Sequence, residues 1–282
     1  MRRCLVCALA LTLAAPAWAA DHLGSYTWTP DWPEAGGFSA LWLGPDGEQF
    51  ATLSDRGYWV QGRLVRDATG AVTSVRQVTH GPLLRSTGGR LRGKEFDAEG
   101  LARTEAGWFV AFEGVHRVMR HDTLDSPPER IPLPPAFDGL QANSGLEALA
   151  ASADGTLYAI PERSGAVERP FPVYCYDTGQ WRQPFGLRRD GPFLVSGADI
   201  FDGRLYILER HFALVGFRSR VRSFDMTGGD ERLEMESGLR DHDNLEGIAV
   251  WQDADGRRRM TLVSDNNQQV LQRTEFVDYV LD

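Results

Sequence analysis

Short apolar runs alternate with turn residues along almost the whole chain, and most of the runs come in pairs. A Gly-containing turn separates the two runs of each pair, and Asp-Gly turns favour a two-stranded antiparallel hairpin because they accept positive φ. These turns are Asp46-Gly47, Ala106-Gly107, Asp154-Gly155, Asp202-Gly203 and Asp255-Gly256. No long stretch has the 3.6-residue period of an amphipathic helix. The pattern therefore predicts an all-β protein.

The hairpins recur roughly every 50 residues, the spacing of blades in a β-propeller. Further strand-like runs follow the hairpins, such as residues 58–65 and 72–78 in the first unit. The last unit is one strand short, and we expect residues 22–29 to supply it, because closing the ring removes open sheet edges. We predict five four-stranded blades closed by the N-terminal strand. Six blades are the alternative, since the first unit is long, and two packed β-sandwiches are another.

The N-terminal residues have the composition of a signal peptide. Arg2 and Arg3 precede an apolar run, and Ala17-Trp18-Ala19 fits the small-x-small pattern of a cleavage site. We expect residues 1–20 to be a signal peptide and residues 21–282 to form a single propeller domain of a periplasmic or secreted protein. No later run has the length of a spanning helix, so we expect no membrane insertion.

Net charge and cysteine content limit the partners and the disulfides that the chain can have. The 282 residues include 39 Asp and Glu against 30 Lys and Arg, a formal net charge of −9. This balance argues against nucleic acid or an anionic membrane surface as a partner. Cys175 would be alone in the mature chain, and we expect it to be a buried strand residue without a disulfide. The oligomeric state stays open.

Acidic residues recur at the hairpin ends opposite the turns. The first and last residues of an antiparallel hairpin lie side by side, and the first strand of each propeller blade lines the axis. We therefore expect one mouth to collect Glu99 with Glu113, Glu147 with Glu162, Asp199 with Glu209, Glu246 with Asp265, and Ser39 with Asp55. Converging carboxylates are costly unless they bind a cation, pair with Arg or take up protons.

Two of these remedies are present in the sequence. Arg56, Arg163 and Arg210 directly follow acids at three hairpin ends. Oxygen ligands without clustered His or Cys favour Ca²⁺, with Mg²⁺ as the alternative, over zinc. His116 and His211 also lie near the expected mouth, where imidazole can carry protons. The competing interpretation is structural: the carboxylates would satisfy loop N–H groups and neighbouring Arg side chains.

Other catalytic motifs are incomplete. Residues 88–95 match a P-loop until Glu95, which stands where a Mg²⁺-binding hydroxyl is required, so we expect a flexible basic loop. The sequence contains neither a G-x-S-x-G elbow nor an H-E-x-x-H motif.

A series of short motifs resembles the phytase-like domain family known as esterase-like activity of phytase. They are Gly36-Gly-Phe-Ser-Ala-Leu, Leu53-Ser-Asp-Arg-Gly57, Asp97-Ala-Glu-Gly-Leu-Ala, Phe112-Glu-Gly, Gly145-Leu-Glu-Ala-Leu-Ala, Asn244-Leu-Glu-Gly-Ile-Ala and Ser264-Asp-Asn. The resemblance extends from about Gly36 to Leu281 and implies an exported bacterial β-propeller with hydrolase activity.

There is a looser resemblance to calcium-dependent lactonase propellers of the gluconolactonase and paraoxonase type. Glu99, Glu147 and Glu246 stand where those propellers have a metal-binding Asn, and Asp265 stands where they have a metal-binding Asp. The longer and more acidic Glu departs from the lactonase pattern but still supplies oxygen ligands for a metal.

These observations lead to one main hypothesis, a metal-assisted hydrolase of small-molecule esters or phosphoesters. Ca²⁺ would be held by Glu99, Glu147, Glu246 and Asp265, and the general base would be Asp55, Glu113 or Glu162. The anionic oxygens would face Arg56, Arg163 and Arg210. The alternative is a non-catalytic periplasmic binding propeller for a cationic ligand or an envelope protein. A quinone-cofactor dehydrogenase shares the architecture, but no adjacent Cys pair or repeated Trp pattern supports it.

Overall fold

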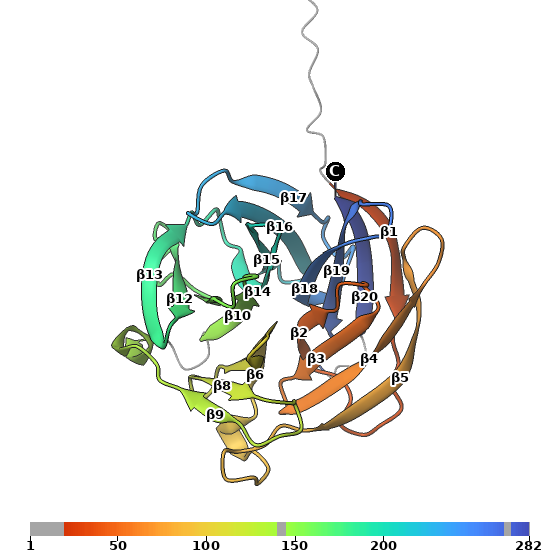
Figure 1. Cartoon of the computed structure of the whole chain (residues 1–282). Helices are drawn as coiled ribbons and strands as arrows, with labels where there is room; N and C mark the ends of the chain where they lie inside the picture. Colours follow the sequence, from red (N-terminus) through yellow and green to blue (C-terminus); the bar gives the residue numbers. More distant parts are fainter. Residues whose placement is uncertain (1–19, 140–144, 268–271, 282) are drawn as a thin grey trace, which may run out of the picture.

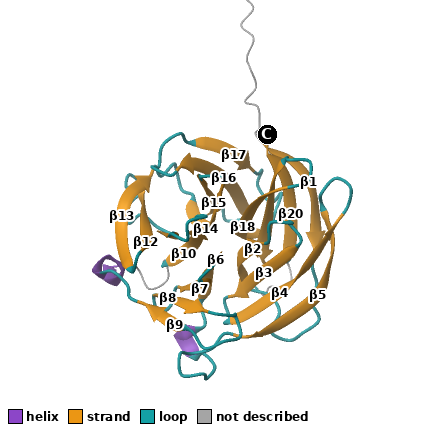
Figure 2. Cartoon of the chain, viewed as in Figure 1, coloured by secondary structure: helices purple, strands orange, loops and turns teal. Residues whose placement is uncertain are grey.

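The computed structural model describes residues 20–139, 145–267 and 272–281. The predicted signal peptide, residues 1–20, lies outside them except for its last residue. The described residues form five four-stranded antiparallel sheets, which surround one axis as the blades of a propeller (Figure 1). Strands dominate the ring, and the helical segments are two short 3₁₀ turns at its outside (Figure 2). No helix among the described residues is long and apolar enough to cross a membrane.

From the axis outward, the first blade consists of β2 (Phe38–Leu43), β3 (Gln49–Ser54), β4 (Tyr58–Arg66) and β5 (Val72–Pro82). The second consists of β6 (Ala98–Thr104), β7 (Gly107–Phe112), β8 (Arg117–His121) and β9 (Glu129–Ile131). The third consists of β10 (Leu146–Ala151), β11 (Leu157–Pro161), β12 (Phe171–Asp177) and β13 (Gln180–Leu187). The fourth consists of β14 (Leu194–Phe201), β15 (Arg204–Phe212), β16 (Phe217–Asp225) and β17 (Arg232–Glu236).

The fifth blade combines both ends of the chain. It consists of β18 (Asn244–Gln252), β19 (Arg258–Asp265), β20 (Glu275–Leu281) and, outermost, β1 (Ala20–Thr27), which pairs antiparallel with β20. The predicted closure by the N-terminal strand is confirmed. The blade count is five, because the extra length of the first unit lies in β5 and in the connection 83–97, which contains η1 (Gly93–Glu95). The second 3₁₀ turn, η2 (Pro135–Gly139), lies between the second and third blades.

Apolar side chains fill the spaces between neighbouring blades, so the inner strands of each sheet are buried on both faces, whereas outermost strands such as β1 and β13 are largely exposed. Leu208 and Val221 of the fourth blade, for example, join Ile248 and Leu262 of the fifth in one cluster. The free Cys175 is buried, as predicted, and packs in the cluster between the third and fourth blades. Burial on both faces explains why the strand sequences are largely apolar runs.

A β-bulge recurs at the start of every inner strand. Pairing with the second strand shifts register around one residue in each blade. A bulge changes the direction in which a side chain points. The bulged residues are Ser39, Glu99, Glu147, Ser196 and Glu246. We call the face where the inner strands begin the mouth face and the opposite one the turn face.

Candidate functional site

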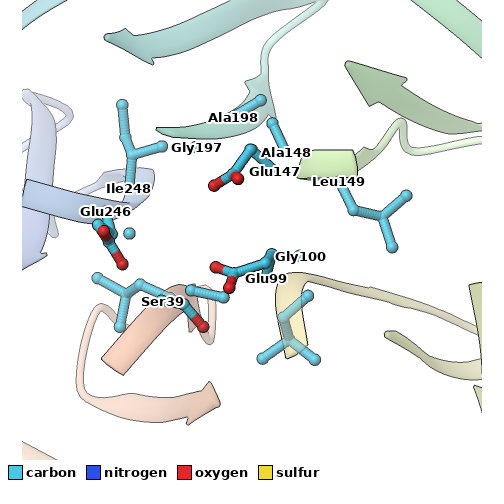
Figure 3. A pocket seen from close by; sticks show the side chains of 14 residues that line it. Ser39, Glu99, Gly100, Glu147, Ala148, Leu149, Gly197, Ala198, Glu246 and Ile248 are labelled. Atoms are coloured by element: carbon cyan, nitrogen blue, oxygen red, sulfur yellow. The ribbon is translucent and has the colours of Figure 1, made fainter. Parts of the chain in front are cut away.

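The bulges direct three carboxylates to the axis. Glu99, Glu147 and Glu246 point into one space (Figure 3), and each is less than a tenth exposed. The cavity that they line has a volume of about 10 Å³, enough for one water-sized occupant. The two uncharged members of the ring, Ser39 and Ser196, donate hydrogen bonds to the main-chain carbonyls of Ala98 and Leu245 in the next blade. Three of the five blades therefore contribute a carboxyl group to this ring.

A second ring lies at the ends of the second strands. The backbone N–H groups of Asp55, Glu113 and Glu162 donate to carbonyls that precede the inner strands of their own blades, at 2.8, 2.8 and 3.1 Å. Asp265 and Arg210 occupy the matching positions, paired with Asn244 and Leu194. We call the bulged Glu residues, this second ring and Asp97 the acidic well.

The prediction that Asp199 and Glu209 join the well is wrong. Glu209 pairs with Val195 one position before the well and is fully buried between Arg220 and Arg222, with N–O distances of 2.9 and 2.7 Å. Asp199 lies three residues beyond the bulge, where its carboxylate accepts backbone N–H groups of Ile200 and Val250. It lines a separate cavity of about 460 Å³ toward the turn face.

Arg210 compensates one side of the well. Its guanidinium donates to Glu246 and to Asn244 Oδ1 at 2.9 Å, and it lies 3.8 Å from Glu162. Asn244 Nδ2 also donates to Glu246 Oε1 at 2.7 Å. Burial opposes the charge of Arg210, but the surrounding glutamates outweigh it and raise its pKa. Arg210 was predicted to face substrate oxygens, and it is instead engaged with the carboxylates of the protein itself.

The opposite side carries a cluster of acids. Oxygens of Asp97, Glu99 and Glu113 lie within 4.8 Å of one another. Burial, followed by repulsion from Glu147 and Glu246, raises the pKa of Glu99 well above its ordinary value. Burial also raises the pKa of Glu147 well above its ordinary value, although Arg210 opposes the shift. These carboxyl groups therefore favour a proton or a cation as partner.

Main-chain donors hold this cluster in place. Gly114 N donates to Asp97 Oδ2 at 3.1 Å, and Gly145 N of the third blade donates to Glu113 Oε1 at 3.0 Å. Asp97 was not among the predicted site residues. It lies two positions before Glu99, as Asn244 lies two before Glu246, and this shared spacing is the signal in the sequence that could have found both.

Two aspartates complete the well. Burial, followed by Glu246, raises the pKa of Asp265 to about 8, while Asn267 N donates to its carboxylate at 2.7 Å. Burial and then Glu246 also raise the pKa of Asp55 to about 6, against the opposing effect of Arg56. A Cβ on Gly37 would lie 2.0 Å from Asp55 Oδ1, and Gly37 has φ of +66°, so this position requires glycine.

The remaining predicted residues lie at the edge of the well. Arg56 is exposed beside Asp55, and Arg163 is half-exposed with its Nε 3.0 Å from Glu162 Oε2. His116 lies close to Gly145 and Glu113, and its buried Nδ1 has no hydrogen-bond partner among the described residues. His211 packs against the ring of Phe193. The proton-carrier role of both histidines stays a prediction.

The donor set of the well fits a hard divalent cation. It consists of carboxylate oxygens, and His and Cys are absent from the oxygen cluster of Asp97, Glu99 and Glu113. Ca²⁺ and Mg²⁺ prefer such oxygen ligands, whereas zinc sites in proteins usually include nitrogen or sulfur. The buried acids also supply the negative charge that compensates the desolvation of a cation.

Several solved structures are similar to this chain, and one with a TM-score above 0.5 supports the fold. The GH43 protein BlXynB from Bacillus licheniformis superposes with a TM-score of 0.52 at 11% identity, over 91% of this chain and 54% of that chain. A luciferin-regenerating enzyme gives a TM-score of 0.47 at 12% identity, over 93% of this chain and 96% of that chain. Hydrazine synthase of Kuenenia stuttgartiensis gives a TM-score of 0.43 at 17% identity, over 86% of this chain and 60% of that chain. The chain thus spans less than two thirds of the first and third of these proteins.

Sequence comparison identifies the family. No curated protein sequence matches the chain. Residues 33–268, by contrast, match a family model described as "Phytase-like: Esterase-like activity of phytase". This match covers most of the propeller, including both rings of the acidic well. The protein therefore belongs to the phytase-like family, whose description suggests a hydrolase-like function.

Proposed function

We propose that the protein is a metal-assisted hydrolase of ester or phosphoester bonds, and that its reaction takes place at the acidic well. The observation that carries the proposal is the cluster of Asp97, Glu99 and Glu113, whose oxygens lie within 4.8 Å of one another. Like charges this close are stabilised by protons or by a cation. The family membership supports hydrolysis as the use of such a cation.

Asp97, Glu99 and Glu113, together with the facing Glu147, are the residues that would hold Ca²⁺ or Mg²⁺. Of the other predicted ligands, Glu246 already accepts hydrogen bonds from Arg210 and Asn244, and Asp265 lies on the same side of the well. A bound divalent cation would supply Lewis acidity at the carbonyl or phosphoryl oxygen of the substrate.

We assign the role of general base to Asp55. Its pKa of about 6 keeps most of it ionised at neutral pH while retaining basicity, and it is half-buried. Asp55 accepts a long hydrogen bond of 3.4 Å from Ser54 Oγ, whereas Glu113 accepts the Gly145 N–H at 3.0 Å and Glu162 pairs with Arg163 at 3.0 Å. Asp55 would therefore take the proton of the attacking water.

The exposed guanidinium groups Arg56 and Arg163 would meet the anionic oxygens of the substrate. Both follow residues of the second ring and remain accessible to solvent. Arg210 is mostly buried and ion-paired, so we assign it to positioning Glu246 and neighbouring carboxylates. Its contribution to the reaction would be indirect.

The test is hydrolysis of a panel of chromogenic carboxyl esters, phosphate esters and lactones by protein stripped with chelator and then supplied with Ca²⁺ or Mg²⁺. We expect activity that depends on the cation and falls strongly in Glu99→Gln. Glu105→Gln, which alters an exposed acid on the turn face, is the matched control and should resemble the unmodified protein. Activity that survives chelation would refute the metal-assisted scheme, and cation binding without turnover would favour the binding propeller.

A further inference from the structure

Exposed apolar side chains gather on the mouth face. Eight large hydrophobic side chains are exposed among the described residues, and their exposed fractions run from 36% for Phe96 to 89% for Leu214. Seven lie in loops of the mouth face or where a strand enters one, and we call these loops the rim. The seven are Phe96, Val115, Val167, Phe212, Leu214, Val215 and Leu239, whereas the eighth, Leu233, lies in β17.

The turn face lacks this feature. Its hairpin turns are built largely from Asp, Gly, Ser and Thr, and none of the eight exposed hydrophobic residues lies in them. The turn face carries the connections between the first and second and between the third and fourth strands of a blade, whereas the mouth face carries those between the second and third strands and those between blades. The difference therefore points to a function of the mouth face, since exposed apolar groups that cluster usually mark an interaction site.

Leu214 shows this most clearly. It lies at the tip of the β15–β16 connection, in a tight turn closed by hydrogen bonds from Val215 N to Ala213 O at 2.6 Å and from Ala213 N to Gly216 O at 2.9 Å. Its φ is +58°, a conformation that disfavours leucine relative to Gly or Asn. The residue is thus unfavourable for the turn and makes little contact with the rest of the fold. Contact with a partner would explain it.

The rim is also basic. Among the residues whose exposure is described, its exposed basic side chains are Arg56, Arg90, Arg92, Lys94, Arg163, Arg169, Arg188, Arg240 and Arg273, and its exposed acidic side chains are Asp31, Glu168, Asp190 and Asp241. Arg188 is paired with Glu231 at 2.9 Å, so the other basic side chains carry the excess of positive charge. The chain as a whole has a net charge of −9, so the rim differs in sign from the average. The acids of the well are largely buried below it, and only the rim can touch a surface laid against this face.

We propose that the rim docks the mouth face onto an anionic lipid surface, with its apolar side chains entering the headgroup region and its Arg side chains meeting lipid phosphates. The apolar residues belong to separate loops on different sides of the mouth, which suits a flat partner better than a single small ligand. The basic side chains match anionic headgroups, and the repulsion from the distant acids is screened beyond about 8 Å at physiological salt. Docking does not depend on whether the well is catalytic.

The test is co-sedimentation of the purified protein from Ala20 onward, which keeps β1 but lacks the apolar run of the predicted signal peptide, with vesicles of phosphatidylcholine alone or with phosphatidylglycerol added. We expect binding to the anionic vesicles that weakens with salt. The triple variant Phe212→Ser, Leu214→Asn, Val215→Ser should bind about tenfold more weakly or worse, and Asn suits the positive φ at position 214. Arg90→Gln with Arg240→Gln should reduce binding to anionic vesicles.

Leu233→Thr is the matched control, because it removes an exposed leucine outside the rim from a strand that accepts threonine. It should bind vesicles like the unmodified protein, and equal melting temperatures would show that all variants are folded. The proposal is overturned if the unmodified protein ignores anionic vesicles, or if Leu233→Thr loses as much binding as the triple variant. It is also overturned if the triple variant dissociates a dimer seen by light scattering while vesicle binding is absent, since the rim would then be a protein interface.

Discussion

Arg210 forms an ion pair with Glu246 across the boundary between the fourth and fifth blades. In the other four blades the position of Arg210 is occupied by an acid, so the fivefold repeat is broken at this one place. The consequence is an asymmetric well. Carboxylates on one side are compensated by the protein, while Asp97, Glu99 and Glu113 on the other are left to a proton or a cation.

Replacing Arg210 should destabilise the protein strongly. Arg210→Gln leaves Glu246 and its buried neighbours without their counter-charge, and breaking a buried pair in this way costs about 3 kcal/mol or more. Urea denaturation at neutral pH in chelator measures the loss. The double variant Arg210→Gln, Glu246→Gln should recover much of it. A double variant as unstable as the single one would show that the ion pair is not the cause.

The stability of the cation-free protein should decrease with rising pH. The pKa of Asp265 is about 8 in the folded protein, far above its ordinary value of 3.8, and that of Glu99 is also raised. An acid with a raised folded pKa binds its proton more tightly when folded, so stability falls between the unfolded and folded pKa values. The slope is at most about 1.4 kcal/mol per pH unit for each group.

Thermal melts in chelator from about pH 5 to about pH 8 check this slope. Asp265→Asn removes one titrating group and should flatten the curve, and added Ca²⁺ should stabilise mainly at the upper end, where the carboxylates are ionised. A melting temperature that rises with pH in chelator would contradict the assigned carboxyl environments.

Hydrolysis should follow the ionisation of Asp55. If Asp55 is the general base, kcat/KM rises with pH as Asp55 ionises, and the midpoint lies at or below about 6, because a bound cation lowers the pKa of a neighbouring carboxyl group. Asp55→Asn lowers kcat/KM about a hundredfold or more. Bound metal should be unchanged in this variant, which distinguishes a base from a ligand. If Asp55→Asn lost its bound metal together with its activity, Asp55 would be a ligand of the cation instead of the general base.

Closure of the ring should be essential for folding. A chain that starts at Trp28 lacks β1 and exposes the edge of β20, so we expect aggregation and loss of a cooperative melt. A chain that starts at Ala20 keeps β1 and should behave like the full-length protein. Size-exclusion chromatography and thermal melts compare the two. A monomeric shorter chain with an unchanged melting temperature would show that β1 is dispensable.

The fold could be predicted because its determinants are local. Each hairpin turn and each apolar run can be recognised from a few residues. The spacing of the units implies a ring that the N-terminal strand must close. The family resemblance drawn from the same motifs is confirmed by the family model. The alternative of six blades arose because the first unit is long, and the sequence pattern does not distinguish a long connection from an additional sheet.

The site could be predicted only in part, because register decides which acids converge. Asp199 was matched to the glutamates by its acidity, whereas the bulge selects Ser196, which precedes Gly197 as Glu246 precedes Gly247. The same error placed Glu209 in the second ring and Arg210 beside it, whereas the structure has Arg210 at that position of the ring. Asp97 faces Glu113 at the open end of the β6–β7 hairpin, and its position two residues before Glu99 is the signal that the prediction missed.

The most direct test of the central claim is calorimetric titration of chelator-stripped protein with Ca²⁺. We predict saturable binding accompanied by proton release, seen as a dependence of the heat on the buffer, because buried carboxyl groups with raised pKa values must ionise to hold the ion. Glu99→Gln should weaken this binding at least about tenfold, and Glu105→Gln should leave it unchanged. No saturable binding, or equal affinity in Glu99→Gln, would contradict a cation site in the acidic well.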